Sequence, residues 1–188
     1  MKRILTTLCA VLLVAVAALA QDAPKRYGIK SGQFKTETNM MGQKIVATTY
    51  FDDYGITQIT KTKVSMMGVS MDMGTLMKDG KTYMINYGDR QVQEIPAPET
   101  INYMNLTDEA VKKYKVKNEG VEEVAGKSCL VFSMEVSQQG QTAKSKASVW
   151  EGIPMKTVTE TMGLSVTQTV VEFKEGPVDA SLFEVPTF

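Results

Sequence analysis

The sequence predicts an α+β protein that is mainly antiparallel β: a strongly curved sheet of about 10–11 strands forming an unclosed barrel, with one or two short helices as a lid. Strand-forming segments alternate with glycine-containing turns over most of the chain. Helix signals are confined to two short segments. The length of 188 residues, with 43% hydrophobic and 22% charged residues, suits a single globular domain.

The first twenty residues have the features of a secretory signal peptide. Lys2 and Arg3 precede an apolar run that closes on Ala18-Leu19-Ala20. This run is shorter than the roughly 20 residues needed to cross a bilayer. We therefore expect residues 1–20 to be removed and residues 21–188 to form one domain. That domain would be periplasmic, or secreted, with no transmembrane segment in the mature chain.

Composition excludes several classes of function. The sequence contains no histidine, which rules out Ser-His-Asp and Cys-His catalysis. Removal of Lys2 and Arg3 with the signal leaves 19 basic against 21 acidic side chains, a formal charge of −2 that gives no reason to expect nucleic acid. Cys129 would be the single cysteine of the mature chain, and its apolar neighbours predict a buried residue. The sequence predicts no enzyme and no cofactor.

The N-terminal half is predicted to be an antiparallel meander. Its turns are marked by Gly42, by Asp52 to Gly55, by Gly68 and by Asp79-Gly80, the last a dipeptide suited to a primed hairpin turn. The expected strands cover residues 27–40, 44–51, 56–64, 69–77, 82–87 and 90–95.

A helix is predicted after the break at Pro96-Ala97-Pro98. Thr107 is suited to be its N-cap, Asp108 and Glu109 occupy the first turn, and two lysines lie near its end. The helix is expected to run to Tyr114 and to act as the lid.

The C-terminal half repeats the pattern of strands and turns. Gly120 and Gly126 are expected to flank a short connection, and Pro177 to open a helical turn over residues 178–183. The expected strands cover residues 129–136, 142–150, 155–162 and 164–174.

A sheet of this size must close, split or be covered, because an exposed apolar face aggregates. A half-barrel with a small lid would leave an apolar slot for a hydrophobic ligand. The alternative is an interior filled by the protein's own side chains, as in a structural or surface-interaction module. The candidate slot residues are Met66, Met67, Met71, Met73, Met77, Phe132, Met134, Trp150 and Met155.

The methionines between residues 66 and 77 allow three interpretations. Flexible thioethers can line an adaptable apolar surface. They can also bind Cu(I), with Met67, Met71 and Met73 as ligands. They can be core and turn residues without special function. Strand alternation places Met71, Met73 and Met77 on one face, which suits either of the first two interpretations.

Four segments share features with one known family: residues 49–55, 120–129, 149–156 and 182–186. Together they resemble the periplasmic lipoprotein-carrier-like (LolA/LolB-like) superfamily and its uncharacterised secreted relatives in Bacteroidetes. The resemblance implies an unclosed barrel with a helical lid, reception of lipoprotein acyl chains, a membrane-associated donor or acceptor protein as partner, and no catalytic residues. The sequence thus predicts a non-catalytic binding or carrier protein for a lipid-like or acylated ligand, with a Cu(I)-binding protein or a filled structural module as alternatives.

Overall fold

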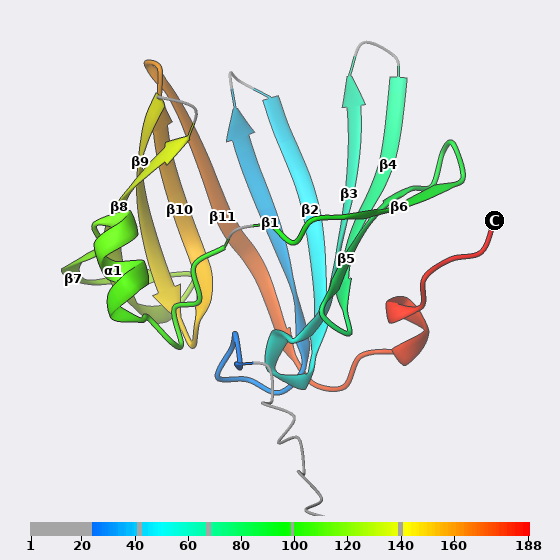
Figure 1. Ribbon diagram of the computed structural model, residues 1–188, viewed down its shortest axis with the longest axis horizontal. Helices are drawn as coiled ribbons and strands as arrows, with labels where there is room; N and C mark the ends of the chain where they lie inside the picture. The colour runs from blue at the N-terminus through cyan, green and yellow to red at the C-terminus, as the bar shows by residue number, and fades with distance from the viewer. Residues whose placement is uncertain (1–23, 41–42, 67–68, 99, 139–140) are drawn as a thin grey trace, which may run out of the picture.

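The computed structural model describes residues 24–40, 43–66, 69–98, 100–138 and 141–188, so the predicted signal peptide lies outside the described residues. Eleven strands form one antiparallel sheet in the order β6-β5-β4-β3-β2-β1-β11-β10-β9-β8-β7. The sheet is strongly curved, and β6 and β7 form its two ends within the described chain (Figure 1). The predicted unclosed, mainly antiparallel architecture is therefore confirmed. The strands are β1 Gly32–Met40, β2 Gln43–Asp52, β3 Thr57–Met66, β4 Val69–Lys78, β5 Lys81–Asn86, β6 Gln91–Ile95, β7 Lys117–Val124, β8 Lys127–Gln138, β9 Gln141–Trp150, β10 Ile153–Thr161 and β11 Leu164–Glu175.

Two meanders, β1–β6 and β7–β11, build the sheet and meet at its centre. The first strand pairs with the last, with Gly32 opposite Glu175 and Asn39 opposite Thr167. Residues 96–98 and 100–107, with helix α1 (Asp108–Tyr114), lie across the open side of the sheet between the two meanders (Figure 1). Register shifts in the β1–β11, β9–β10 and β7–β8 pairs are bulges, which increase twist and bend the sheet.

Tight turns fix the register of the hairpins. Both central residues have positive φ at Asp79-Gly80, Ala125-Gly126, Glu151-Gly152 and Met162-Gly163, as primed two-residue turns require. The Asp79-Gly80 turn, for example, sets Lys78 opposite Lys81. The sequence predicted a primed turn at this first site.

The two helical predictions are confirmed. Thr107 caps α1, and its Oγ1 accepts a hydrogen bond from the Ala110 amide at 3.2 Å. The C-terminal turn is the 3₁₀ helix η2 (Ala180–Phe183), where the Asp179 carboxylate accepts from the Ser181 amide at 3.0 Å. A further 3₁₀ turn, η1 (Asp53–Gly55), lies at the expected turn between β2 and β3.

Two local expectations were wrong. The segment expected to be a connection between Gly120 and Gly126 belongs largely to β7, which buries only Val124 fully and therefore lacks the apolar alternation of a central strand. The first strand begins at Gly32 instead of Tyr27. Tyr27 lies in the loop before it, with its amide bonded to the Tyr54 carbonyl at 2.9 Å.

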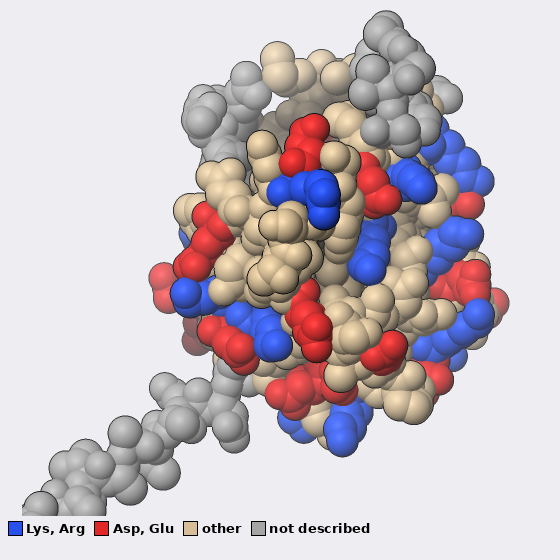
Figure 2. Space-filling view, turned by 90° about the vertical axis from the view of Figure 1, so that its right-hand side faces the viewer, with Lys and Arg blue, Asp and Glu red and all other residues tan. Residues whose placement is uncertain are grey.

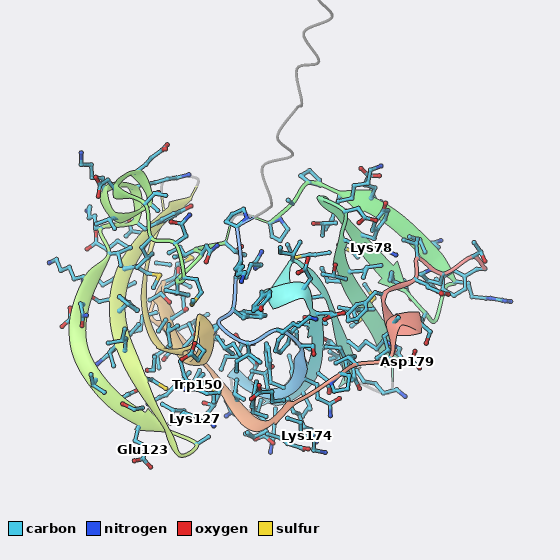
Figure 3. The ribbon with its side chains drawn as sticks, turned by 90° about the horizontal axis from the view of Figure 1, so that it is seen from below. Lys78, Glu123, Lys127, Trp150, Lys174 and Asp179 are labelled. Carbon is cyan, nitrogen blue, oxygen red and sulfur yellow. The ribbon has the colours of Figure 1, made fainter. Side chains whose placement is uncertain are left out.

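Both faces of the first meander are partly covered by the ends of the chain. The C-terminal segment passes from Lys174 to Asp179 outside the curve of the sheet (Figure 3). There Phe183 packs on one face of β3–β5, against Ile59, Leu76 and Ile85.

In the described residues, no helix has the length and apolar character required to span a membrane.

Candidate functional site

Charge is sorted between the two faces of the sheet. Residues paired across antiparallel strands lie on the same face. Thr36, Ala47, Thr62 and Met73 form one such row over four neighbouring strands. On this face of β1–β6 and β8–β11, the described register places one charged residue, Glu175, at the last position of β11. The other charged residues of those strands lie on the opposite face.

We call the part of this surface on β1–β5 the neutral face. Its side chains are mostly threonine and methionine, with a few aliphatic residues. Hydroxyl groups bond to one another across it, as Thr49 Oγ1 and Thr60 Oγ1 do at 2.8 Å. Away from its covered end, its members are Thr36, Thr38, Ile45, Ala47, Thr49, Thr60, Thr62, Val64, Met71, Met73, Thr75, Met84 and Asn86. The covered end adds Phe34, Phe51, Gln58, Met77 and Thr82.

The N-terminal segment covers one end of this surface. The ring of Tyr27 packs edge-on against Phe51 and Phe34, with centroids 4.9 and 6.3 Å away. Its hydroxyl donates to Gln58 Oε1 at 2.9 Å. Burial raises the pKa of Tyr27 to about 12, which a nearby arginine, Arg26, partly offsets. This end of the surface is therefore filled by the protein itself.

Met77 belongs to the covered end. Its sulfur accepts hydrogen bonds from Gln58 Nε2 at 3.4 Å and from Arg26 Nη1 at 3.9 Å. Arg26 in turn donates to Thr100 Oγ1 at 2.8 Å, which ties the connecting segment to the same place. Met77 shares the face of Met71 and Met73, as predicted, but has a structural role.

Met71, Met73 and Met84 lie beyond the covered end. Met71 is 45% exposed, Met84 is 40% exposed and Met73 is half-buried. Met84, which lies opposite Thr75, was not among the predicted slot residues. The turn at Asp79-Gly80 could have predicted this position, because a two-residue turn there fixes which residues of β4 and β5 lie opposite each other. Met67 lies outside the described residues, and only the backbone of Met66, at the end of β3, is described.

Phe132 and Met134 lie beneath the lid. The Tyr103 ring stacks on Phe132 with centroids 5.6 Å apart, and its hydroxyl donates to the Met134 sulfur at 3.7 Å. Burial raises the pKa of Tyr103 to about 12. Leu106 and Tyr114 pack against the same cluster, so the lid covers these two candidate slot residues directly.

Trp150 and Met155 belong to a separate core cluster. Trp150 meets Phe173 edge-on with centroids 5.2 Å apart, and the Lys127 ammonium lies 4.2 Å from the Trp150 ring (Figure 3). Met155 sits at the β10 bulge and is 1% exposed. Cys129 is buried in this cluster, as predicted, and burial raises its thiol pKa. The structure thus separates the predicted slot residues into three places.

A cleft of about 400 Å³ lies over β8–β10, and Met134 is the predicted slot residue among those that line it. Lysines and glutamates line it, including Lys115, Lys117, Lys144 and Glu135. Lys115 forms an ion pair with Glu135 and, through this hydrogen bond and charge, lowers the pKa of that carboxyl. Charges of both signs also alternate on the side of the molecule shown in Figure 2. Lysines outnumber glutamates among the residues that line the cleft, so its charged rim is mainly basic.

No protein-family profile and no curated protein matches the sequence. Solved structures do match. An uncharacterized conserved protein from Thermus thermophilus is 13% identical with a TM-score of 0.56, covering 84% of this chain and 86% of that one. A chain of the Pseudomonas aeruginosa MucA/MucB complex is 14% identical with a TM-score of 0.55, covering 83% of this chain and 56% of that one.

MucB crystallised alone matches similarly, at 13% identity and a TM-score of 0.52, with 84% of this chain and 57% of that chain covered. The chain therefore spans little more than half the length of the MucB structure. At these identities the likeness establishes a shared fold.

Proposed function

We propose that this chain, which has the unclosed half-barrel fold of the LolA/LolB-like superfamily, is a non-catalytic binding or carrier protein for a lipid-like or acylated ligand, held on the neutral face. The proposal places it in the periplasm after removal of residues 1–20. MucB, which has the same fold, was solved in complex with MucA. A protein partner, such as a membrane-associated donor or acceptor, is accordingly part of the proposal.

This proposal rests mainly on one observation: the charged side chains of β1–β5 lie on the face opposite the neutral face. An acyl chain gains about 0.8 kcal/mol for each methylene it buries. That gain is lost where the chain must desolvate a charged side chain. On β1–β5 the described ladders turn every charged side chain away from the neutral face. Methyl groups of threonine and the thioethers of methionine remain as contact surface.

The residues of this face support binding without a fixed shape. Methionine adapts to irregular ligands because it is unbranched and rotates about three bonds. Met71 and Met84 expose much of their surface. Both methionines lie on adjacent strands of one face that lacks charged side chains, which supports a surface that a ligand covers.

A charge placed on the neutral face tests the proposal. Thr62 is on this face, and its neighbour Lys63 is on the other, 3.9 Å from Asp72. Thr62→Glu and Lys63→Gln change the net charge equally, so they form a matched pair. We expect Thr62→Glu to weaken binding of a fluorescent dipalmitoylated lipopeptide at least about tenfold, since it buries a carboxylate against acyl chains. Lys63→Gln should bind as wild type does.

Fluorescence titration measures both affinities, with circular dichroism and the melting temperature as controls for folding. Equal affinity in the two folded variants would place the ligand elsewhere. Failure of the wild-type chain to bind the lipopeptide would overturn the proposed function and favour the filled structural module.

A further inference from the structure

We propose that the cleft over β8–β10 binds an extended acidic segment of a partner protein, which adds as a strand to the free edge of β8. This goes beyond the proposed function, because it assigns a peptide site to the charged side of the sheet and needs no ligand on the neutral face. Two independent observations support it: a stretch of strand edge without a partner, and a group of lysines without ion pairs.

The ladder between β7 and β8 ends before β8 does. Its outermost pair is Lys117 with Ser133, whereas on the other side β8 stays paired with β9 as far as Gln138. The chain before β7 turns away from this edge, since the Val116 amide donates to the Val111 carbonyl of α1 at 3.0 Å. In the described ladders, β8 beyond Ser133 therefore has no strand on its β7 side. Such an edge can pair with a strand from another chain.

The free edge opens into the cleft. Met134 and Glu135, the first two residues of β8 beyond the ladder, both line it. The cleft volume of about 400 Å³ is within the range of ligand-binding clefts. Val158, which lies opposite Lys146 on β9, adds apolar surface between the charged side chains. A polypeptide laid along the edge of β8 would therefore place alternate side chains in this cleft.

The charge of the cleft selects an acidic segment. Four lysines and two glutamates line it, a net charge of +2. The charge stays positive even with Glu119, which accepts a hydrogen bond from Ser133 at 2.6 Å. Lys115 is paired with Glu135. The three other lysines are exposed and form no ion pair with any described residue; they are Lys117, Lys144 and Lys146.

The register spaces these lysines to suit an extended chain. Lys117 and Lys146 lie on either side of Ser133 in one cross-strand row, about 10 Å apart at the usual strand spacing. Lys144 is two positions from Lys146 on β9, about 6.7 Å away. Side chains on one face of an extended peptide repeat at this same spacing. Acidic residues at alternate positions would therefore meet ammonium groups that have no other carboxylate partner.

Peptide titration of the mature chain tests the site. The probe is a fluorescein-labelled decapeptide of alternating glutamate and threonine, and the charge control has lysine in place of glutamate. We expect the protein to bind the acidic peptide alone, and more weakly in high salt. Binding of both peptides, or of neither, would overturn the site.

Two triple variants with equal net charge locate the peptide. The test variant is Lys117→Gln/Lys144→Gln/Lys146→Gln. The matched control, Lys35→Gln/Lys61→Gln/Lys63→Gln, removes three lysines from the charged side of β1 and β3, which are paired along both edges. We expect binding of the acidic peptide to weaken at least about tenfold in the test variant and to stay within about twofold of wild type in the control. Equal losses in the two variants, with unchanged melting temperatures, would overturn the site.

Hydrogen exchange distinguishes strand addition from attraction between charges alone. The acidic peptide should slow exchange of backbone amides within residues 134–138, because an added strand accepts hydrogen bonds from that edge. Peptide binding without this protection would overturn the inference. Binding to phosphatidylglycerol vesicles that the acidic peptide cannot displace would also overturn it, by assigning the lysines to a membrane surface.

Lipopeptide binding separates this inference from the proposed function. The test variant changes no residue of the neutral face, so it should bind the dipalmitoylated lipopeptide as wild type does. Loss of lipopeptide binding by the wild type, with intact binding of the acidic peptide, would overturn only the carrier function.

Discussion

Two tyrosines, Tyr27 and Tyr103, mark where the protein covers its own surface. Tyr27 fills one end of the neutral face, and Tyr103 holds the connecting segment against Phe132 and Met134. Each keeps its phenol in a largely dry environment, which raises its pKa to about 12. Each phenol therefore resists ionisation in the folded protein more than in the unfolded chain.

The stability of the protein should fall in strong alkali for this reason. The unfolded phenol ionises near pH 10 and the folded one near 12, so the stabilisation is complete below about pH 10 and is lost as the pH rises toward 12. The loss should be about 1.4 kcal/mol per pH unit for each tyrosine. Urea unfolding at pH 9 and pH 11.5 should show a shallower decline in Tyr103→Phe than in wild type. Parallel declines would contradict the prediction.

The candidate site was predictable from sequence only in part. Alternation placed Met71, Met73 and Met77 together correctly. It gave no information on contacts between distant segments, such as Arg26 with Met77 or Tyr103 with Met134. Those contacts depend on how loops cross the sheet, which has no local pattern in the sequence.

Hairpin turns fix the register of the strands, and two of these turns differ in how closely other segments pack against their glycine. Gly152 and Gly163 occupy equivalent turn positions, with φ of 76° and 78°. A Cβ at Gly163 would have nothing within 4 Å. At Gly152 it would lie 2.3 Å from the Arg26 carbonyl oxygen and 2.6 Å from Met104 Cγ. The β9–β10 turn is thus packed against both the N-terminal and the connecting segments.

The two alanine variants separate backbone strain from packing. Gly163→Ala should cost about 1–2 kcal/mol, the penalty for a left-handed alanine. Gly152→Ala should cost about 1–3 kcal/mol more, because the backbone of the N-terminal segment must move. Urea denaturation of both variants measures the difference. Equal costs would show that the turn is not tightly packed.

Most strands and both short helices could be predicted from the sequence. Glycine turns, strand-forming residues and the Thr107 cap correctly located most strands and both short helices. The edge strand β7 was missed because neither of its faces is consistently buried. Its sequence therefore lacks the alternation of apolar and polar residues that predicts a strand.

At the scale of the whole molecule, the C-terminal segment stabilises the outer side of the curve. Phe183 is 5% exposed over Ile59, Leu76 and Ile85, whereas Phe188 is 50% exposed. Phe183→Ala should lower the free energy of unfolding by about 3–5 kcal/mol. Phe188→Ala, which loses mainly an edge-on contact with Tyr87, should cost less than about 1.5 kcal/mol. Thermal and urea unfolding measure both, and similar costs would contradict this role for the segment.

The central pair of the sheet is made from its first and last strands, β1 and β11. A ribosome must therefore release the residues from β1 through β11 before this central pair can form. Until then β1 presents an unpaired edge, which can recruit strands from other molecules. Contacts between such distant parts of the chain also slow folding. We therefore expect the middle of the sheet to form only after β11 has joined β1.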